Sequence, residues 1–302
     1  MTMNRTRLLL ILLLGYASNL MAGIEVIDDN GAAVRLPGPA RRIISLSPHL
    51  TELAYAAGAG SRVIADVAYS DFPPAARTLP RVGDYHTLDI EAIIALHPDL
   101  VLAWKSGNRA SDLEKMRSLG LKIFVSEPVH LRDIPRQIDA IATLAGTESE
   151  GAIAIRQFKQ RYRRLQEQYA ARSNVRVFFQ IWDRPIMTVN GNHIVNDVIE
   201  LCGGRNIFAN LGELAGNVAL ESVIKRNPEV ILVANTGTPG QQWVSDWSRW
   251  PQIEAVSRHQ VYSIDPDLIS RQTPRILDGA AELCSLLDRV RHSQGRITAP
   301  DR

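Results

Sequence analysis

Short apolar runs and helix-spaced apolar positions alternate along most of the chain. In the first half, four apolar runs bounded by turn residues are typical of buried strands: RRIISLS (41–47), VIADVA (63–68), DLVLAW (99–104) and KIFVSE (122–127). Between them, LTELAYAAG, IEAIIAL and SDLEKMRSLG have the three- and four-residue spacing of helices. This alternation predicts a parallel sheet covered by helices on both faces, preceded by a small hairpin or edge element in IEVIDDNGAAVRL (24–36).

The alternation stops between Ile134 and about Arg172. From residue 149 onward this segment has no proline, and no glycine after Gly151. Its apolar residues recur at three- and four-residue steps: Ala152, Ile155, Phe158, Tyr162, Leu165 and Tyr169. The spacing predicts one long amphipathic helix. Alternation restarts at VRVFFQI (175–181), so the helix joins two α/β halves and, unlike a Gly/Ser linker, allows little opening and closing.

A weak internal repeat supports two related halves. LDIEAIIALHPDLVLAW and VALESVIKRNPEVILVA share a glutamate, six residues, a proline, an acid and an apolar run, so Glu91 to Pro98 and Glu221 to Pro228 have the same spacing. We therefore expect an α/β fold of two lobes with parallel central sheets, joined by one long α-helix, with a ligand cleft between the lobes. The expected boundaries are a signal peptide at 1–22, an N-terminal lobe at 23–146, the linking helix at 147–173 and a C-terminal lobe at 174–302.

The first 22 residues have the pattern of a secretory signal. Arg5 and Arg7 precede the apolar run from Leu8 to Leu14, and Ala22 supplies a small residue for cleavage. We expect a cleavable signal and a soluble periplasmic protein; an N-terminal membrane anchor is the alternative. Without Arg5 and Arg7, 32 basic residues balance 32 acidic ones, which argues against a nucleic-acid partner.

Two cysteines, Cys202 and Cys284, remain in the exported chain. An even count in an oxidising compartment favours a disulfide between them. Two buried free thiols are the alternative.

Several residues that follow the predicted strands could form a binding surface, because parallel sheets bind ligands at the carboxyl ends of their strands. They are Ser47-Pro48, Tyr69, Trp104, Glu127, Trp182, Thr236 and Asp267, and Tyr85 lies in a further loop. Aromatic residues are only 6% of the chain, so their number here predicts the lining of a large, flat, partly apolar ligand. Rings that cap the core at strand ends are the alternative for each residue alone.

Motifs of enzymes are not found in this sequence. GAGSRV, from Gly58, lacks the third glycine of a dinucleotide fingerprint and follows a helix. The histidines are scattered, so we expect no metal site and no catalytic residues. His49 and Glu52 could pair on one helical turn, while Ser47-Pro48 has the form of an N-cap and first-turn proline, which is a structural role.

The chain resembles the cobalamin-binding branch of the helical-backbone class of periplasmic binding proteins, whose other members bind metals, haem and siderophores. The resemblance runs from about Arg41 to Arg291. Its motifs here are ISLSPHLTELAYAAGA, YSDFPP, LDIEAIIALHPDLVLAW, IELCGGRNIF, LESVIKRNPEVILV and SRQTPRI. YSDFPP together with LAW and LCGGRNIF points to the cobalamin branch.

The resemblance implies roles for individual residues. Those implied to contact the corrinoid are Tyr69, Trp104, Asp267 and Arg271, and Tyr85 stands where the family often has a tryptophan. Leu268, Ile269 and Ser270, in the loop between Asp267 and Arg271, are further candidate contacts, although the family usually has Trp-Phe where this chain has Leu268-Ile269. Glu91 and Glu221 match glutamates that dock on permease arginines, although an acid in a first helical turn also stabilises the helix dipole without any partner. The cysteines match the family's disulfide. Ala215 stands near the place of a usual cleft tryptophan, and Trp182 could supply that ring.

The function that follows is capture of cobalamin or a related corrinoid and its delivery, by a monomeric protein, to the permease of an ABC importer in the inner membrane. Cobalamin is then the transported ligand, not a cofactor. The nearest alternative is the same fold binding haem, with Tyr69 or His49 as axial ligand, or an iron siderophore, for which Arg184 and Arg271 are the evident cations. A secreted hydrolase is the alternative from another class, and no nucleophile and base can be assembled for it.

Overall fold

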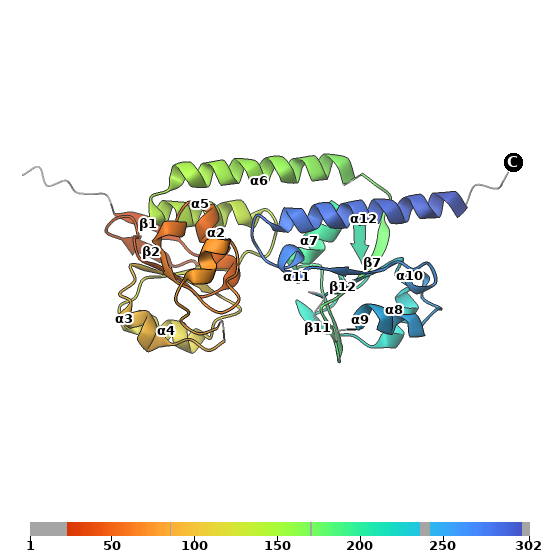
Figure 1. Ribbon diagram of the computed structural model, residues 1–302, viewed down its shortest axis with the longest axis horizontal. Helices are drawn as coiled ribbons and strands as arrows, with labels where there is room; N and C mark the ends of the chain where they lie inside the picture. The colour runs from red at the N-terminus through yellow and green to blue at the C-terminus, as the bar shows by residue number, and fades with distance from the viewer. Residues whose placement is uncertain (1–22, 85, 170, 236–241, 298–302) are drawn as a thin grey trace, which may run out of the picture.

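Two α/β lobes lie side by side beneath two long helices, α6 and α12 (Figure 1). The computed structural model describes residues 23–84, 86–169, 171–235 and 242–297. The predicted signal peptide therefore lies outside the described residues, as do Tyr85 and Thr236. We use the lobe boundaries proposed above to name the two halves.

The N-terminal lobe is built on a four-stranded sheet of order β4-β3-β5-β6 in which all neighbours are parallel. Its strands are β3 (Ile43–Ser45), β4 (Val63–Ala65), β5 (Leu100–Trp104) and β6 (Ile123–Ser126). The helices are α2 (Pro48–Ala56), η1 (Gly60–Arg62), η2 (Pro74–Thr78), α3 (Ile90–Ala95), α4 (Ala110–Ser118) and α5 (Asp133–Ala145). An antiparallel hairpin of β1 (Ile24–Ile27) and β2 (Ala33–Leu36) precedes them, as predicted.

The strands of this sheet are buried on both faces, which explains their continuous apolar runs. Leu100 and Leu102 of β5 belong to the core cluster that includes residues of α2 and α5. Val101 and Ala103, which alternate with them, belong to a second cluster that includes Ile93 of α3. Successive side chains point to opposite faces of a strand, so an apolar run with no polar interruption requires a cover on each side. The prediction of a covered parallel sheet is confirmed.

The long helix α6 (Glu148–Tyr169) lies within the expected range and has 22 residues. Phe158 and Tyr169, two positions of its apolar stripe, are buried in the core. Near its start the helix approaches α5 closely, since a Cβ added to Gly151 would lie 2.6 Å from the Cβ of Ala142. A glycine is therefore needed where the two helices meet.

The C-terminal lobe has a parallel sheet of order β10-β7-β12-β13. Its strands are β7 (Val175–Gln180), β10 (Gly204–Asn206), β12 (Val230–Ala234) and β13 (Val261–Ile264). A second, antiparallel sheet, of order β11-β9-β8, was not predicted; it contains β8 (Trp182–Asp183), β9 (Ile186–Val189) and β11 (Ala215–Asn217). The helices are α7 (Ile194–Leu201), α8 (Leu220–Arg226), α9 (Trp243–Asp246), η3 (Trp247–Arg249), α10 (Glu254–Ser257), α11 (Pro266–Ile269) and α12 (Ile276–Ile297).

A disulfide joins Cys202 to Cys284. Cys202 follows the last residue of α7 and Cys284 lies within α12, so the bond ties these two helices together. Both residues are fully buried. The pairing expected from the even cysteine count is confirmed.

One buried apolar cluster continues through both lobes. It includes Leu53 of α2, Phe158 of α6, Val198 of α7 and Leu287 of α12, together with side chains from both parallel sheets. The opposite faces of the sheets have separate clusters, one in each lobe. Because close-packed interiors resist deformation, a shared layer beneath α6 favours a fixed relation between the lobes.

Candidate ligand site at the junction of the lobes

The start of α2 places a buried histidine at the lobe junction. Pro48 occupies the first turn and Ser47 is the extended N-cap residue, as expected. The Ser47 hydroxyl does not cap the helix, however, because it pairs with Nδ1 of His49 at 2.6 Å. Burial, and then the nearby charge of Arg271, lower the pKa of His49 to about 3, so the imidazole is neutral.

Trp104, at the carboxyl end of β5, packs against this histidine. The two rings meet edge to face, with centroids 5.2 Å apart and planes at 83°. Gly107 lies over the indole, where an added Cβ would come 1.8 Å from a ring carbon. The backbone N–H of Trp104 donates to Asn108 Oδ1 at 2.7 Å, which closes the loop around the ring. Trp104 is thus fixed on two sides.

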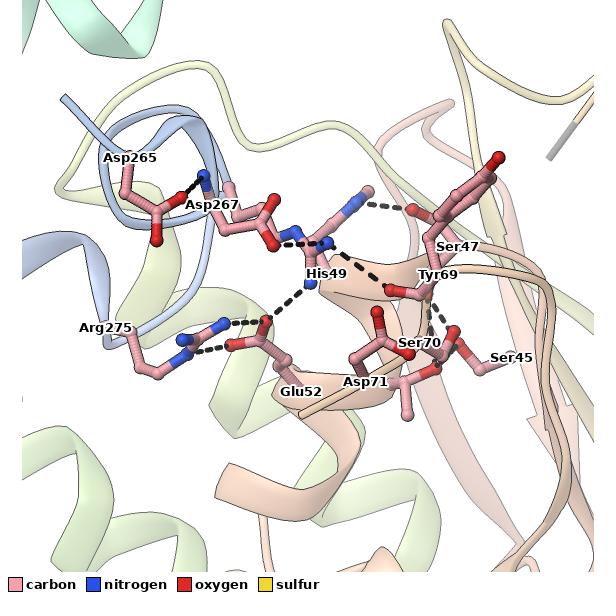
Figure 2. Close-up of polar contacts among 12 residues, drawn as sticks. Ser45, Ser47, His49, Glu52, Tyr69, Ser70, Asp71, Asp265, Asp267 and Arg275 are labelled. Carbon is pink, nitrogen blue, oxygen red and sulfur yellow. Dashed lines mark hydrogen bonds and ion pairs between the residues drawn. The ribbon is translucent and has the colours of Figure 1, made fainter. Parts of the chain in front are cut away.

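Tyr69 stands in a left-handed backbone conformation, with φ of 67°, and its side chain is 67% exposed. A non-glycine residue adopts this conformation at a cost, so its surroundings must hold it. Arg81 does so by donating to the carbonyls of Val67 (3.0 Å) and Ser70 (3.2 Å). Figure 2 shows the Tyr69 ring pointing away from Glu52, the centre of the polar cluster described next.

A buried acid, Asp66, holds Arg81 in place through an ion pair. Burial raises the pKa of Asp66 to about 6, although the hydrogen bond and the charge of Arg81 act in the opposite direction. The turn that presents Tyr69 is therefore anchored by a charged pair beneath it.

Glu52 is the centre of a polar cluster between the lobes (Figure 2). Its side chain, on α2, is 3% exposed. Arg275 donates to it twice, from Nε at 2.9 Å and from Nη2 at 2.6 Å. Arg271 donates to it from Nη1 at 3.2 Å. Both arginines belong to the segment between α11 and the start of α12 in the other lobe. Glu52 consequently pairs across the junction and not with His49, contrary to the expected alternative.

Asp267 and Arg271, which the resemblance assigns to one loop, lie together. Asp265 caps α11 by accepting from the backbone N–H of Asp267 at 2.8 Å. Arg271 pairs with Asp267 at 2.9 Å and also donates to the carbonyl of Tyr69 at 3.3 Å. Burial raises the pKa of Asp267, partly offset by the charge of Arg271.

The three residues between them differ in accessibility. Leu268 and Ser270 are half-buried. Ile269 is fully buried and belongs to the core, so its side chain has no surface to offer a ligand. Because α11 is a helical turn, one face of it packs inward, and the expected ligand contact at Ile269 would have to come from its backbone.

Trp182 lies apart from these residues. It is 50% exposed at the start of β8, and its ring meets that of Trp243 edge to face at 5.6 Å. In the described part of the chain, no ring contact joins Trp182 to Tyr69 or Trp104. The structure thus brings together Tyr69, Trp104, Asp267 and Arg271, and leaves Trp182 on the side of the C-terminal lobe.

The two predicted docking glutamates are exposed and occupy equivalent places. Glu91 lies in the first turn of α3 and Glu221 in the first turn of α8. Figure 1 shows both helices on the side of their lobes away from α6. Neither glutamate forms an ion pair within the described residues.

The junction also contains a hydroxyl–imidazole pair. Ser47 and His49 form a hydroxyl–imidazole pair, but both are buried, and Nε2 of His49 has no hydrogen-bond partner among the described residues that could orient the ring for catalysis. No group of three or more potential metal ligands occurs in residues 23–84, 86–169, 171–235 and 242–297. Over the same ranges, every helix is too short or too polar to cross a membrane.

Sequence reasoning assigned no role to Arg275 and did not find the partners of Glu52. The sequence did contain a signal for such a cluster, because Arg271 and Arg275 are four residues apart just before a helix. Nothing local identified the acid that they share, which lies in the other lobe.

The chain is similar in sequence to known periplasmic binding proteins. The model of the periplasmic binding protein family matches residues 43–268. The vitamin B12-binding protein of Vibrio cholerae is 38% identical over 252 residues, which are 83% of this chain and 90% of that protein. The vitamin B12-binding protein of Yersinia pestis is 38% identical over 245 residues, covering 81% and 85% of the two chains.

Solved structures show the same fold. The crystal structure of the periplasmic vitamin B12-binding protein of Vibrio cholerae aligns with a TM-score of 0.77 and 38% identity, over 84% of this chain and 98% of that chain. The periplasmic haem-binding protein HutB of Vibrio cholerae aligns with a TM-score of 0.73 over 82% and 98% of the two chains. At 21% identity, the second likeness shows the fold alone.

Proposed function

The chain belongs to the periplasmic binding protein family, and from that premise we propose that it captures cobalamin or a related corrinoid and delivers it to an ABC importer. The observation that carries the proposal is the 38% identity, over most of both chains, to proteins named for vitamin B12 binding. The haem-binding protein that shares the fold is much less similar in sequence.

The chemistry at the lobe junction supports a corrinoid over an anionic ligand. Tyr69 and Trp104 offer aromatic surfaces suited to a large flat ring. Arg271 and Arg275, the arginines at the junction, are already paired with Glu52 and Asp267. Haem propionates or an anionic iron chelate would need cations that are free to meet them, whereas the rim of cobalamin carries mainly uncharged amides.

The proposed contacts are Tyr69, Tyr85, Trp104, Trp182, Asp267, Leu268, Ser270 and Arg271. The rings would pack on the macrocycle, and the polar groups would fix its orientation. No bond in the ligand is made or broken in this role. The shared core beneath α6 favours capture with little movement of the lobes.

Delivery is proposed to use Glu91 and Glu221. They begin equivalent helices on the side of the protein away from α6, so one flat partner could meet both (Figure 1). Each glutamate would pair with an arginine of the permease, and the rest of the permease would straddle the site. We propose further that residues 1–22 direct export to the periplasm and that the mature protein acts as a soluble monomer.

The proposal is tested by mixing the purified protein separately with cyanocobalamin, haem and a ferric hydroxamate, followed by gel filtration with absorbance detection. We expect the cobalamin absorbance to co-elute with protein at a ratio of about one to one, at the volume of a monomer. Co-elution of haem or of the ferric chelate, with cobalamin left in the small-molecule fraction, would replace cobalamin with that ligand.

A further inference from the structure

Glu52 balances the charge of the lobe junction. The side chain is buried, yet it meets both arginines of the opposite lobe, with oxygen–nitrogen distances of 2.6 to 3.2 Å. Asp267 meets only Arg271, and its side chain is 41% exposed. Glu52 and Asp267 thus face the two guanidinium groups, and Asp265 adds a further carboxylate nearby, so the cluster has no excess of positive charge.

The donors of Arg275 are directed at Glu52 and not outward. Its Nε and one Nη both reach this carboxylate, and its guanidinium lies 3.9 Å from the centroid of the Phe72 ring. The hydrogen bond to Glu52, ahead of the other causes, raises the pKa of Arg275. The guanidinium is therefore held by two hydrogen bonds to Glu52 and by contact with the Phe72 ring.

The second arginine is occupied in a similar way. Arg271 divides its donors among Glu52, Asp267 and the carbonyl of Tyr69. A carboxylate on an incoming ligand would have to displace one of these acceptors. Displacing Glu52 would remove one of the three hydrogen bonds that a buried carboxylate accepts from the two arginines, which is unfavourable.

We propose that Glu52 is a specificity-determining residue, which occupies Arg271 and Arg275 so that the site selects uncharged amide groups on the ligand rim and rejects carboxylates. This inference rests on the proposed function, because it assumes that a corrinoid binds beside this cluster. An amide N–H can donate to the exposed oxygens of Asp267, while a carboxylate there is repelled by Asp267 and finds Arg271 already paired. Negative charge supplied by the protein therefore acts against anionic ligands of similar shape.

The test compares two corrinoids that differ in these groups: dicyanocobinamide, whose side chains are amides, and dicyanocobyrinic acid, whose side chains are carboxylates. Affinities are measured by equilibrium dialysis at low ionic strength for the wild type and for Glu52→Gln, which keeps the shape and removes the charge. We expect the wild type to prefer cobinamide. In Glu52→Gln the preference should shift toward cobyrinic acid by about tenfold or more, because the two arginines then face one carboxylate only.

Two further variants test the size and the direction of the shift in preference between the two corrinoids. Asp267→Asn removes the more exposed carboxylate and should shift the preference in the same direction but less. Arg275→Gln leaves excess negative charge and should shift the preference toward cobinamide. This variant provides the test if a thermal melt shows that Glu52→Gln does not fold. Glu167→Gln, at an exposed position of α6, is the matched control and should leave the preference unchanged.

The outcomes separate this inference from the proposed function. If Glu52→Gln weakens both corrinoids equally, or if Arg275→Gln fails to shift the preference the other way, Glu52 acts only to hold the lobes and the inference is overturned. If the wild type binds cyanocobalamin but does not distinguish cobinamide from cobyrinic acid, the inference fails while the proposed function stands. If the wild type binds no corrinoid, the proposed function itself fails.

Discussion

The two lobes contain the same helix–proline–strand unit but differ in what stands at the end of its strand. In the N-terminal lobe, α3 leads through Pro98 into β5, which ends in Trp104. In the C-terminal lobe, α8 leads through Pro228 into β12, which ends in Ala234. Equal spacing therefore specifies equal backbone units, while the last side chain of the strand decides which lobe presents a ring beside the junction.

The aromatic residues of the C-terminal lobe serve mainly its core. Trp243 and Trp247 are buried there, and the indole N–H of Trp247 donates to Gln180 Oε1 at 2.8 Å. Trp182 packs on Trp243 and stays half exposed. Tryptophan is large enough to contribute greatly to a core and polar enough to need a hydrogen-bond partner there. The number of aromatic side chains in a lobe therefore does not show which lobe binds a flat ligand.

The largest test of the comparison concerns the disulfide, which only the C-terminal lobe has in the described residues. Its cysteines are 82 residues apart, and closing such a loop stabilises a chain by about 4.5 kcal/mol in the chain-entropy model. Urea unfolding of the double variant Cys202→Ala, Cys284→Ala should show a loss of about this size. Dithiothreitol should destabilise the wild type similarly and leave the double variant unaffected; a wild type indifferent to reductant would contradict the account.

Each lobe also has a histidine at the start of a helix, with His49 buried and His193 half-buried. Burial lowers the pKa of His49 from 6.5 to about 3 and that of His193 to about 4. Since both folded-state values lie below the unfolded one, the stabilisation is complete above pH 6.5 and is lost as the pH falls toward 3 or 4.

At pH 4 the loss from His49 alone should be about 3 kcal/mol, because one pKa unit corresponds to about 1.4 kcal/mol. His49→Gln should remove that part of the acid destabilisation seen by urea unfolding between pH 7 and pH 4. His193→Asn should remove a similar or smaller part from the other lobe. The exposed His292, changed to Gln, is the control; equal pH profiles in all three variants would refute the assignment.

Helix capping also differs between the lobes. The Asp89 carboxylate accepts from the backbone N–H of Ala92 at 2.9 Å and caps α3, whereas Ala219 at the same place before α8 has no such group. Asp89→Ala should cost about 1 kcal/mol of unfolding free energy, and Ala219→Asp should gain up to a similar amount. Thermal melts of both variants check this, and a stabilising effect of Asp89→Ala would reverse the comparison.

The aromatic asymmetry predicts unequal effects on binding. Trp104→Ala and Tyr69→Ala should each weaken cobalamin binding by about 0.5–1.5 kcal/mol, the scale of an aromatic contact. Trp182→Ala should have a smaller effect, because its ring belongs to the tryptophan cluster of the C-terminal lobe. Isothermal titration of the three variants decides the order, and an effect of Trp182→Ala larger than that of Trp104→Ala would move the site toward the C-terminal lobe.

The smallest effects are expected where the lobes are most alike. Exposed ion pairs contribute under about 1 kcal/mol each and act mainly on orientation and association rate. Charge reversal by Glu91→Lys with Glu221→Lys should leave cobalamin affinity unchanged and slow uptake by the importer, more at low salt than at high. Normal uptake by the double variant would remove the docking role, and lost cobalamin binding would assign these glutamates to the site or the fold.

The candidate site could be predicted in part. Tyr69, Trp104, Asp267 and Arg271 were identified because strand ends of parallel sheets gather at one edge, and because the motifs around them resemble a known family. The pattern did not show that residues 266–269 form a helical turn, which buries the side chain of Ile269. The antiparallel sheet of β8, β9 and β11 was missed, since its strands are only two to four residues long.

The sequence by itself determined the parallel sheets, the long helix α6 and the disulfide, because each depends on a local pattern or on a count. An unbroken apolar run requires burial on both faces, a three- and four-residue stripe requires one buried side, and two cysteines leave a single pairing. Only the tertiary structure decided that Glu52 meets Arg271 and Arg275, which are 219 and 223 residues away. Many acids could have balanced those arginines, and close packing of the two lobes selects the one whose carboxylate lies within hydrogen-bond distance.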